Sequence, residues 1–185
     1  ENIMHDNTLP KYFLFVDRYD KKNLENHITN LGIIYRNYSK SKNKKDILKI
    51  KSYCKKKGFK FYISNDLKLA IKFKTDGIYI PAFNNKLIIN KLNLEKKFQI
   101  IGSAHNQVEI TRKTKQGCRA IFLSPLFKAK KKKNELGVCK FNLLTLNNKN
   151  KFFALGGINK ENFRILKMLN IHGMAGISYF KKKPA

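Results

Sequence analysis

Eight short apolar segments recur along this 185-residue chain, and their spacing constrains its fold more than any other feature. They are continuous runs rather than alternations of apolar and polar residues, which is typical of strands buried on both faces of a parallel sheet. We predict strands at Tyr12–Val16, Ile33–Arg36, Phe59–Ile63, Gly77–Ile80, Gln99–Gly102, Ala120–Leu123, Phe152–Leu155 and Met174–Ile177.

Segments with the apolar spacing of a helix lie between several of these runs. In Asp46–Lys57, the apolar residues fall near one face, while lysines occupy the other; they are Ile47, Leu48, Ile50 and Tyr53. A glycine stands where several such segments meet the next run, and glycine commonly ends helices. We expect this role for Gly32, Gly58, Gly77, Gly117 and Gly173. Further helices are predicted at Asp66–Lys74, Gln107–Gln116 and Lys160–Leu169.

The order of strand, helix and strand, repeated eight times, predicts a compact (βα)8 TIM barrel in one domain over residues 1–185. A doubly wound open sheet is the alternative, because periodicity does not distinguish a closed sheet from an open one. Such barrels typically have about 250 residues. The helices and loops are therefore near minimal, and we expect the last helix to be short or missing.

The net charge of +28 indicates either anionic partners or a biased composition. Only five of the 40 basic residues are arginine, which specific nucleic-acid readers favour for its planar fork. Lysine, asparagine and isoleucine are abundant together, as in proteins of AT-rich genomes. We therefore expect no specific nucleic-acid partner, although this surface would steer small anions inward.

Membrane and secretory signals are not evident in the sequence. No apolar run approaches the roughly 20 residues of a membrane span, and the first residues lack the pattern of a signal peptide. Cys54, Cys118 and Cys139 form neither a CxxC pair nor a disulfide framework. We expect a reduced, cytoplasmic location and no membrane partner, and the sequence leaves the oligomeric state open.

Candidate site residues follow the predicted strands, because TIM barrels build their active sites at the carboxyl ends of the strands. These positions are polar, small or cationic, in contrast to the strands. Arg36 at such an end suits a phosphate. Asp66 either binds a ligand or caps a helix, and Asn65 can serve turn geometry instead. His105 either takes part in the reaction or caps a helix. The lysines at 128 and 130–133 are either a solvated loop or a lid.

Gly156 and Gly157 separate the seventh strand from the next predicted helix. Glycine serves tight turns with positive φ, but backbone N–H groups at a helix start also bind anions. Loops after strands seven and eight commonly bind phosphate in TIM barrels. We therefore predict a phosphate held by Gly157, Ile177 and Ser178.

The order of these motifs resembles the thiamine-phosphate synthase and thiazole tautomerase family over nearly the whole chain. The matching segments are Val16-Asp17, Arg36-Asn37-Tyr38, Ser64-Asn65-Asp66, Thr75-Asp76-Gly77-Ile78-Tyr79, Gly102-Ser103-Ala104-His105, Ser124-Pro125-Leu126-Phe127 and Gly156-Gly157-Ile158-Asn159-Lys160-Glu161-Asn162. The resemblance implies a TIM barrel that couples hydroxymethylpyrimidine diphosphate with thiazole phosphate, giving thiamine phosphate and diphosphate.

The resemblance also implies roles for individual residues. Arg36 and Asn65 would meet the diphosphate, with Ser103 near the leaving group and Asp66 on Mg²⁺. Lys132 falls in the segment that holds the diphosphate. The thiazole phosphate would lie on the residues predicted above for a phosphate.

Four positions depart from the family pattern. Tyr38 replaces a lysine, Ile34 replaces the glutamine that recognises the pyrimidine, Asn84 replaces a second Mg²⁺ aspartate, and Ala129 begins a segment that replaces Thr-x-Thr-Lys. Two alternatives therefore stand beside the synthase. One is a thiazole tautomerase-type isomerase in which His105 moves a proton. The other is a non-catalytic barrel that binds phosphate or nucleic acid.

Overall fold

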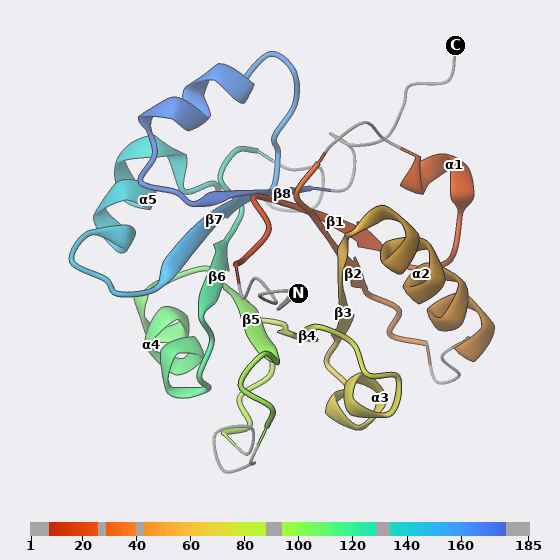
Figure 1. Cartoon of the computed structure of the whole chain (residues 1–185). Helices are drawn as coiled ribbons and strands as arrows, with labels where there is room; N and C mark the ends of the chain where they lie inside the picture. Colours follow the sequence, from red (N-terminus) through yellow and green to blue (C-terminus); the bar gives the residue numbers. More distant parts are fainter. Residues whose placement is uncertain (1–7, 26–28, 40–42, 88–93, 129–133, 177–185) are drawn as a thin grey trace, which may run out of the picture.

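The computed structural model describes residues 8–25, 29–39, 43–87, 94–128 and 134–176. Within these residues, parallel strands pair in sequence order, and β8 pairs with β1 to close a barrel (Figure 1). The strands are β1 (Tyr12–Val16), β2 (Leu31–Tyr35), β3 (Lys60–Ser64), β4 (Gly77–Ile80), β5 (Gln99–Ala104), β6 (Ala120–Leu123), β7 (Lys151–Leu155) and β8 (Gly173–Gly176). The predicted TIM barrel is confirmed, and the open sheet was wrong.

Helices surround the barrel on its outside (Figure 1). They are α1 (Lys21–Leu24), α2 (Lys44–Lys57), α3 (Leu67–Lys72), α4 (Gln107–Lys115), α5 (Gly137–Thr145) and the 3-10 helix η2 (Phe163–Met168). The α-helix expected over Lys160–Leu169 is therefore a shorter 3-10 helix. The predicted short last helix falls after residue 176 and lies outside the described residues. Among the described residues, no helix has both the length and the apolar character needed to cross a bilayer.

The glycines divide into two groups with different physical roles. Gly58 directly follows α2 with φ of +68°, and Gly117 lies two residues after α4 with φ of +80°, as expected for helix ends. Gly32, Gly77 and Gly173 instead lie within strands, so their predicted role was wrong. A Cβ atom on Gly77 would collide with the carbonyl of Gln99 on β5. Close strand packing requires glycine there.

Aromatic side chains fill the inside of the barrel. The ring centre of Phe13 lies 4.9 Å from that of Phe122 and 5.2 Å from that of Phe153. Nearer the carboxyl ends, the ring centre of Phe15 lies 5.2 Å from that of Tyr79. A second apolar layer lies between the strands and the helices. Beyond these aromatic rings, the carboxyl ends of the strands form the rim of the barrel, where the polar candidate residues stand.

Candidate active site

Arg36 follows β2 at the rim of the barrel. Its guanidinium carbon lies 4.7 Å from the ring centre of Phe15, a distance at which a cation and an aromatic face attract each other. A cavity of about 180 Å³ opens beside it. The cavity is lined by Leu14, Phe15, Val16, Asp17, Arg18, Asp20, Asn23 and Arg36. The guanidinium is thus held at a cavity large enough for a small anionic group.

Asn65 and Asp66 follow β3, and both have local structural roles. Asn65 has φ of +57°, and its side-chain Oδ1 accepts a hydrogen bond from Asn84 Nδ2 at 2.6 Å. Asp66 caps α3, because its Oδ1 accepts from the backbone N–H of Leu69 at 3.0 Å. The turn and cap explanations are confirmed, and the ligand roles of both residues stay predictions.

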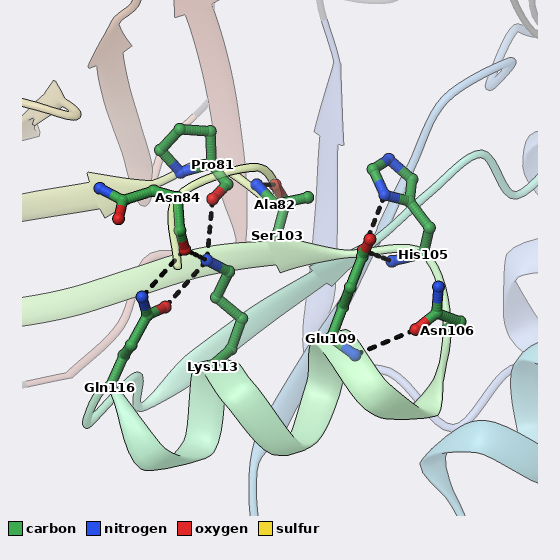
Figure 2. Close-up of polar contacts among 9 residues, drawn as sticks. All are labelled: Pro81, Ala82, Asn84, Ser103, His105, Asn106, Glu109, Lys113 and Gln116. Carbon is green, nitrogen blue, oxygen red and sulfur yellow. Dashed lines mark hydrogen bonds and ion pairs between the residues drawn. The ribbon is translucent and has the colours of Figure 1, made fainter. Parts of the chain in front are cut away.

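The loop after β4, residues 81–87 (hereafter the β4 loop), is held from the next βα unit. Ser103 on β5 is buried, and its Oγ accepts from the backbone N–H of Ala82 at 3.1 Å. Lys113 and Gln116 of the α4 segment donate to backbone carbonyls of the same loop (Figure 2). The structure therefore gives Ser103 a role in holding this loop. Its predicted place beside a leaving diphosphate is untested.

The β4 loop also brings an aromatic pair to the rim. The ring centre of Phe83 lies 5.8 Å from that of Tyr38, which follows β2, and both side chains are more than half exposed. The Tyr38 hydroxyl and the Ser64 hydroxyl are 3.3 Å apart. Ile34, in contrast, is fully buried inside the barrel. The two exposed rings therefore offer an apolar surface beside Asn65 and Asn84.

His105 forms a histidine–carboxylate pair with Glu109 at the start of α4 (Figure 2). The same Glu109 Oε2 lies 2.8 Å from His105 Nδ1 and accepts from the His105 backbone N–H at 2.8 Å. The helix cap itself is Asn106, not His105. A cavity of about 340 Å³ beside the histidine is lined by His105, Ser124, Pro125, Asn134, Glu135, Leu136 and Lys140. A carboxylate on Nδ1 favours the tautomer in which Nε2 is the basic nitrogen.

Gly156 and Gly157 form a turn that only glycine fits well. Their φ values are +94° and +71°, and a Cβ on Gly157 would lie 2.5 Å from the carbonyl oxygen of Phe127. The following helix, η2, begins at Phe163 rather than at the predicted Lys160, so the helix N-terminus lies further from the glycines than expected. Any anion here would meet loop amides instead. Three further predicted site residues lie outside the described residues: Ile177 and Ser178, predicted to bind a phosphate, and Lys132.

The fit of Mg²⁺ can be tested against the oxygen donors at the rim. The described part of the chain contains no group of three or more His, Cys, Asp or Glu placed to hold a metal ion. The Asn84 amide is already used, since Oδ1 accepts from Lys86 N–H and Nδ2 donates to Asn65. Asp66 fits Mg²⁺ only as one ligand beside water and substrate phosphates, which is a common arrangement for this ion.

Several residues of the site were not anticipated from the sequence. Glu109 stands four residues after His105, a spacing that places two side chains on one face of a helix. Lys113 stands three residues after the buried Ile110, and that spacing points it inward. Both signals are present in the sequence. Neither the Gln116 contacts nor the Tyr38–Phe83 pair has such a local signal.

Comparison with known proteins gives a match over most of the chain. The family model described as thiamine monophosphate synthase matches residues 21–180. A thiamine-phosphate synthase of Prochlorococcus marinus subsp. pastoris is 35% identical over 139 residues, which cover 72% of this chain and 39% of the relative. One from Flavobacterium psychrophilum is 30% identical over 135 residues, covering 68% and 65%. The chain spans about two fifths of the length of the Prochlorococcus relatives it matches.

Solved structures share the fold at low sequence identity. A thiamine phosphate pyrophosphorylase from Pyrococcus furiosus superposes with a TM-score of 0.71 at 19% identity, covering 93% of this chain and 87% of that chain. A 4-hydroxy-2-oxoglutarate aldolase superposes with a TM-score of 0.64 at 14% identity, covering 94% and 86%. These similarities establish the barrel architecture.

Proposed function

The chain belongs to the thiamine monophosphate synthase family, and we propose that it couples hydroxymethylpyrimidine diphosphate with thiazole phosphate to give thiamine phosphate and diphosphate. The observation that carries this function is the placement of Arg36, Asn65 and Asp66 after neighbouring strands, on one rim of the barrel. In the reaction, a carbon–oxygen bond to diphosphate breaks and a carbon–nitrogen bond to the thiazole forms. Negative charge therefore grows on the departing diphosphate, and the protein has to stabilise it.

Arg36 is the described residue best suited to that charge. Its guanidinium offers several N–H donors in a planar fork, which matches phosphate oxygens. The cavity beside it also contains Asp17 and Asp20, whose negative charges oppose an anion. Asp20, however, accepts from the backbone N–H of Lys22 at 3.0 Å and from Asn23 Nδ2 at 2.5 Å, so its charge is partly satisfied at the helix start. Lys132 is proposed as a second cation.

Asp66 is proposed as the protein ligand of Mg²⁺ that arrives with the diphosphate. Bound there, Mg²⁺ would neutralise charge on the leaving group. Asp66 already accepts the Leu69 N–H with Oδ1, which fixes the orientation of the carboxylate. Asn65, directly before it, presents its amide to the same region of the rim.

The two rings of the substrates need different surroundings. We place the thiazole phosphate on the amides of the Gly156–Gly157 turn together with Ile177 and Ser178. For the pyrimidine ring, the exposed faces of Tyr38 and Phe83 support a stacking site, because planar rings gain from offset or edge contacts with aromatic side chains. Such a site would take the place of recognition by a glutamine, because this chain has Ile34 at the position of that glutamine.

A tautomerase-type isomerisation of a thiazole phosphate is the second candidate, and the His105–Glu109 pair favours it. Glu109 orients the imidazole, and the histidine borders a cavity. A histidine held in this way can take a proton from one ring atom and return it to another. This reaction requires neither diphosphate nor Mg²⁺.

One experiment separates these functions. Purified protein is incubated with both precursors and Mg²⁺, and the coupled product is sought by mass. A parallel sample contains only the thiazole phosphate and is followed by NMR for isomerisation. Coupling that falls in Arg36→Ala but not in Arg164→Ala, an exposed arginine on η2, supports the synthase. Isomerisation without coupling supports the second function. If neither activity is detected, both proposed functions are overturned.

A further inference from the structure

Lys113 is a fully buried lysine whose charged end faces the β4 loop (Figure 2). Its Nζ atom donates to the carbonyl oxygens of Pro81 at 2.8 Å and Asn84 at 2.9 Å. A third bond goes to the side-chain Oε1 of Gln116 at 2.8 Å. An ammonium group has three N–H donors, so these three acceptors satisfy it completely. All three acceptors are neutral oxygens.

Burying a charge in this way is costly for the fold. Removing an ammonium from water costs several kcal/mol unless its new contacts offset the loss. The stem of Lys113 is nevertheless accommodated, because Gly102 on β5 leaves room for it: a Cβ on Gly102 would lie 2.9 Å from Lys113 Cδ. An apolar side chain would fill this space without the electrostatic cost, so the position of the charge calls for a role beyond packing.

Gln116, one turn further along, holds the same loop from the same side. Its Nε2 donates to the carbonyl oxygens of Asn84 and Lys86, both at 2.9 Å. Together the two side chains bind the carbonyls of residues 81, 84 and 86. Ser103 adds the bond to the Ala82 N–H. The backbone of the β4 loop is thus bound at several successive points from β5 and α4.

Fixing this backbone determines where the Asn84 side chain lies. The backbone carbonyl of Asn84 accepts hydrogen bonds from Lys113 and Gln116. The side-chain Nδ2 of Asn84 donates to Asn65 Oδ1 at 2.6 Å. Asn65 is the residue proposed above to meet the diphosphate. Hydrogen bonds therefore connect the buried Lys113 ammonium, through Asn84, to the Asn65 side chain on the rim.

We propose that Lys113 and Gln116 are positioning residues that hold the β4 loop so that Asn84 and Asn65 form one preformed amide surface for a diphosphate group. The contacts stand on the structure alone, whereas the ligand rests on the proposed function. Preformed donors are worth more to a ligand than mobile ones, because less conformational freedom is lost on binding.

The protonation of Lys113 provides a readout that a purely structural role would not move. Burial lowers the pKa of Lys113 from 10.5 to about 8. The neighbouring Cys118 and Glu109 raise this pKa, and Arg112 lowers it further, but burial dominates. A neutral amine has two N–H donors and a lone pair, so it cannot satisfy all three oxygens. The lowered pKa nevertheless means that release of the loop, which returns this pKa towards 10.5, takes up a proton, so the β4 loop should open less readily as pH rises above about 8.

The test compares Lys113→Met with the matched control Lys115→Met, which removes an exposed lysine from the same helix. Hydrogen exchange is measured without ligand, corrected for the intrinsic rate at each pH. In Lys113→Met, the amides of Asn84 and Lys86 should exchange about tenfold faster at pH 7, while amides of α2 stay unchanged. In the parent, corrected loop exchange should slow as pH rises above about 8, because opening of the loop takes up a proton, and in Lys113→Met it should not depend on pH. Unchanged loop exchange, or equal acceleration throughout the chain, would overturn the positioning role.

Binding of inorganic diphosphate, measured by calorimetry, tests the ligand separately. We expect Lys113→Met to bind about tenfold more weakly than the parent and Lys115→Met to bind equally well, the loss expected for one poorly placed hydrogen bond. Equal binding in all three proteins would overturn the role of the loop in the diphosphate site. A parent that binds no diphosphate, with a loop that still loosens in Lys113→Met, would contradict the proposed function and leave the contacts of Lys113 confirmed.

Discussion

Lys113 Nζ lies 2.8 Å from the carbonyl oxygen of Pro81, which links the buried face of α4 to the loop that follows β4. The two residues are 32 positions apart in the sequence. Because the same nitrogen also binds the Asn84 carbonyl, a helix behind the barrel helps to arrange the rim. Substitutions on the buried face of α4 should therefore affect the rim through the β4 loop.

The stability of the protein should depend on pH through Lys113. Its pKa is lowered to about 8 in the fold and is 10.5 ordinarily, so between these values the unfolded chain binds more protons than the folded one. The free energy of unfolding of the parent, relative to Lys113→Met, should therefore rise with pH across this window, by at most about 1.4 kcal/mol per pH unit. Below pH 8 the difference should be constant. Denaturant titrations of both proteins at several pH values measure it, and a flat difference would refute the lowered pKa.

Asp66 has a cap role and a proposed metal role, and two substitutions separate them. Asp66→Asn keeps a good helix cap but removes the negative charge, whereas Asp66→Ala removes both. We expect Asp66→Ala to lose about 0.5–2 kcal/mol of unfolding free energy and Asp66→Asn to lose little. Both should abolish coupling in the presence of Mg²⁺. Coupling at the parent rate in Asp66→Asn would show that the carboxylate is not needed for the reaction.

The strands could be predicted from the sequence to within two residues of their bounds because each is buried on both faces and is therefore a continuous apolar run. The type of the helix at Phe163–Met168 was harder to predict. Phe163, Leu166 and Leu169 are spaced by three, a spacing that suits a 3-10 helix as well as an α-helix. The α5 helix was not predicted at all.

The position of the candidate site residues at the rim was predictable where they stand at strand ends: Arg36, Asn65, Asp66 and His105 follow strands, and Ser103 is the last residue but one of β5. The hydrogen bonds that hold the β4 loop come from Lys113 and Gln116; the spacing of Lys113 from Ile110 places it on the inner face of α4, but polar residue types are ordinarily assigned to the solvent. Tertiary packing shows that both are fully buried and which carbonyls they bind. Contacts between residues about 30 positions apart have no signature in local periodicity.

His105 and Glu109 should differ in their effects on stability and on any isomerisation. Glu109→Ala removes the acceptor of the His105 backbone N–H as well as the partner of its ring, so it should destabilise the start of α4. His105→Ala keeps the backbone bond. If the protein isomerises a thiazole phosphate, His105→Ala should lower that rate by about a hundred- to ten-thousand-fold, the usual contribution of a general acid–base group. Rates followed by NMR decide it, and an unchanged rate would exclude His105 from the proton transfer.

Gly157 and Gly58 offer a matched pair for testing why the turn after β7 contains glycine. Both have a left-handed φ, +71° and +68°, but only Gly157 has atoms where a Cβ would lie. Gly58→Ala should therefore cost about 1–2 kcal/mol of unfolding free energy, the price of the backbone conformation alone. Gly157→Ala adds a collision with the Phe127 carbonyl and should cost clearly more. It should also weaken phosphate binding if the turn amides hold the thiazole phosphate, because the loops after β6 and β7 would have to separate. Equal costs for the two variants would show that the turn yields to a Cβ, and phosphate affinity unchanged in a folded Gly157→Ala would remove this turn from the phosphate site.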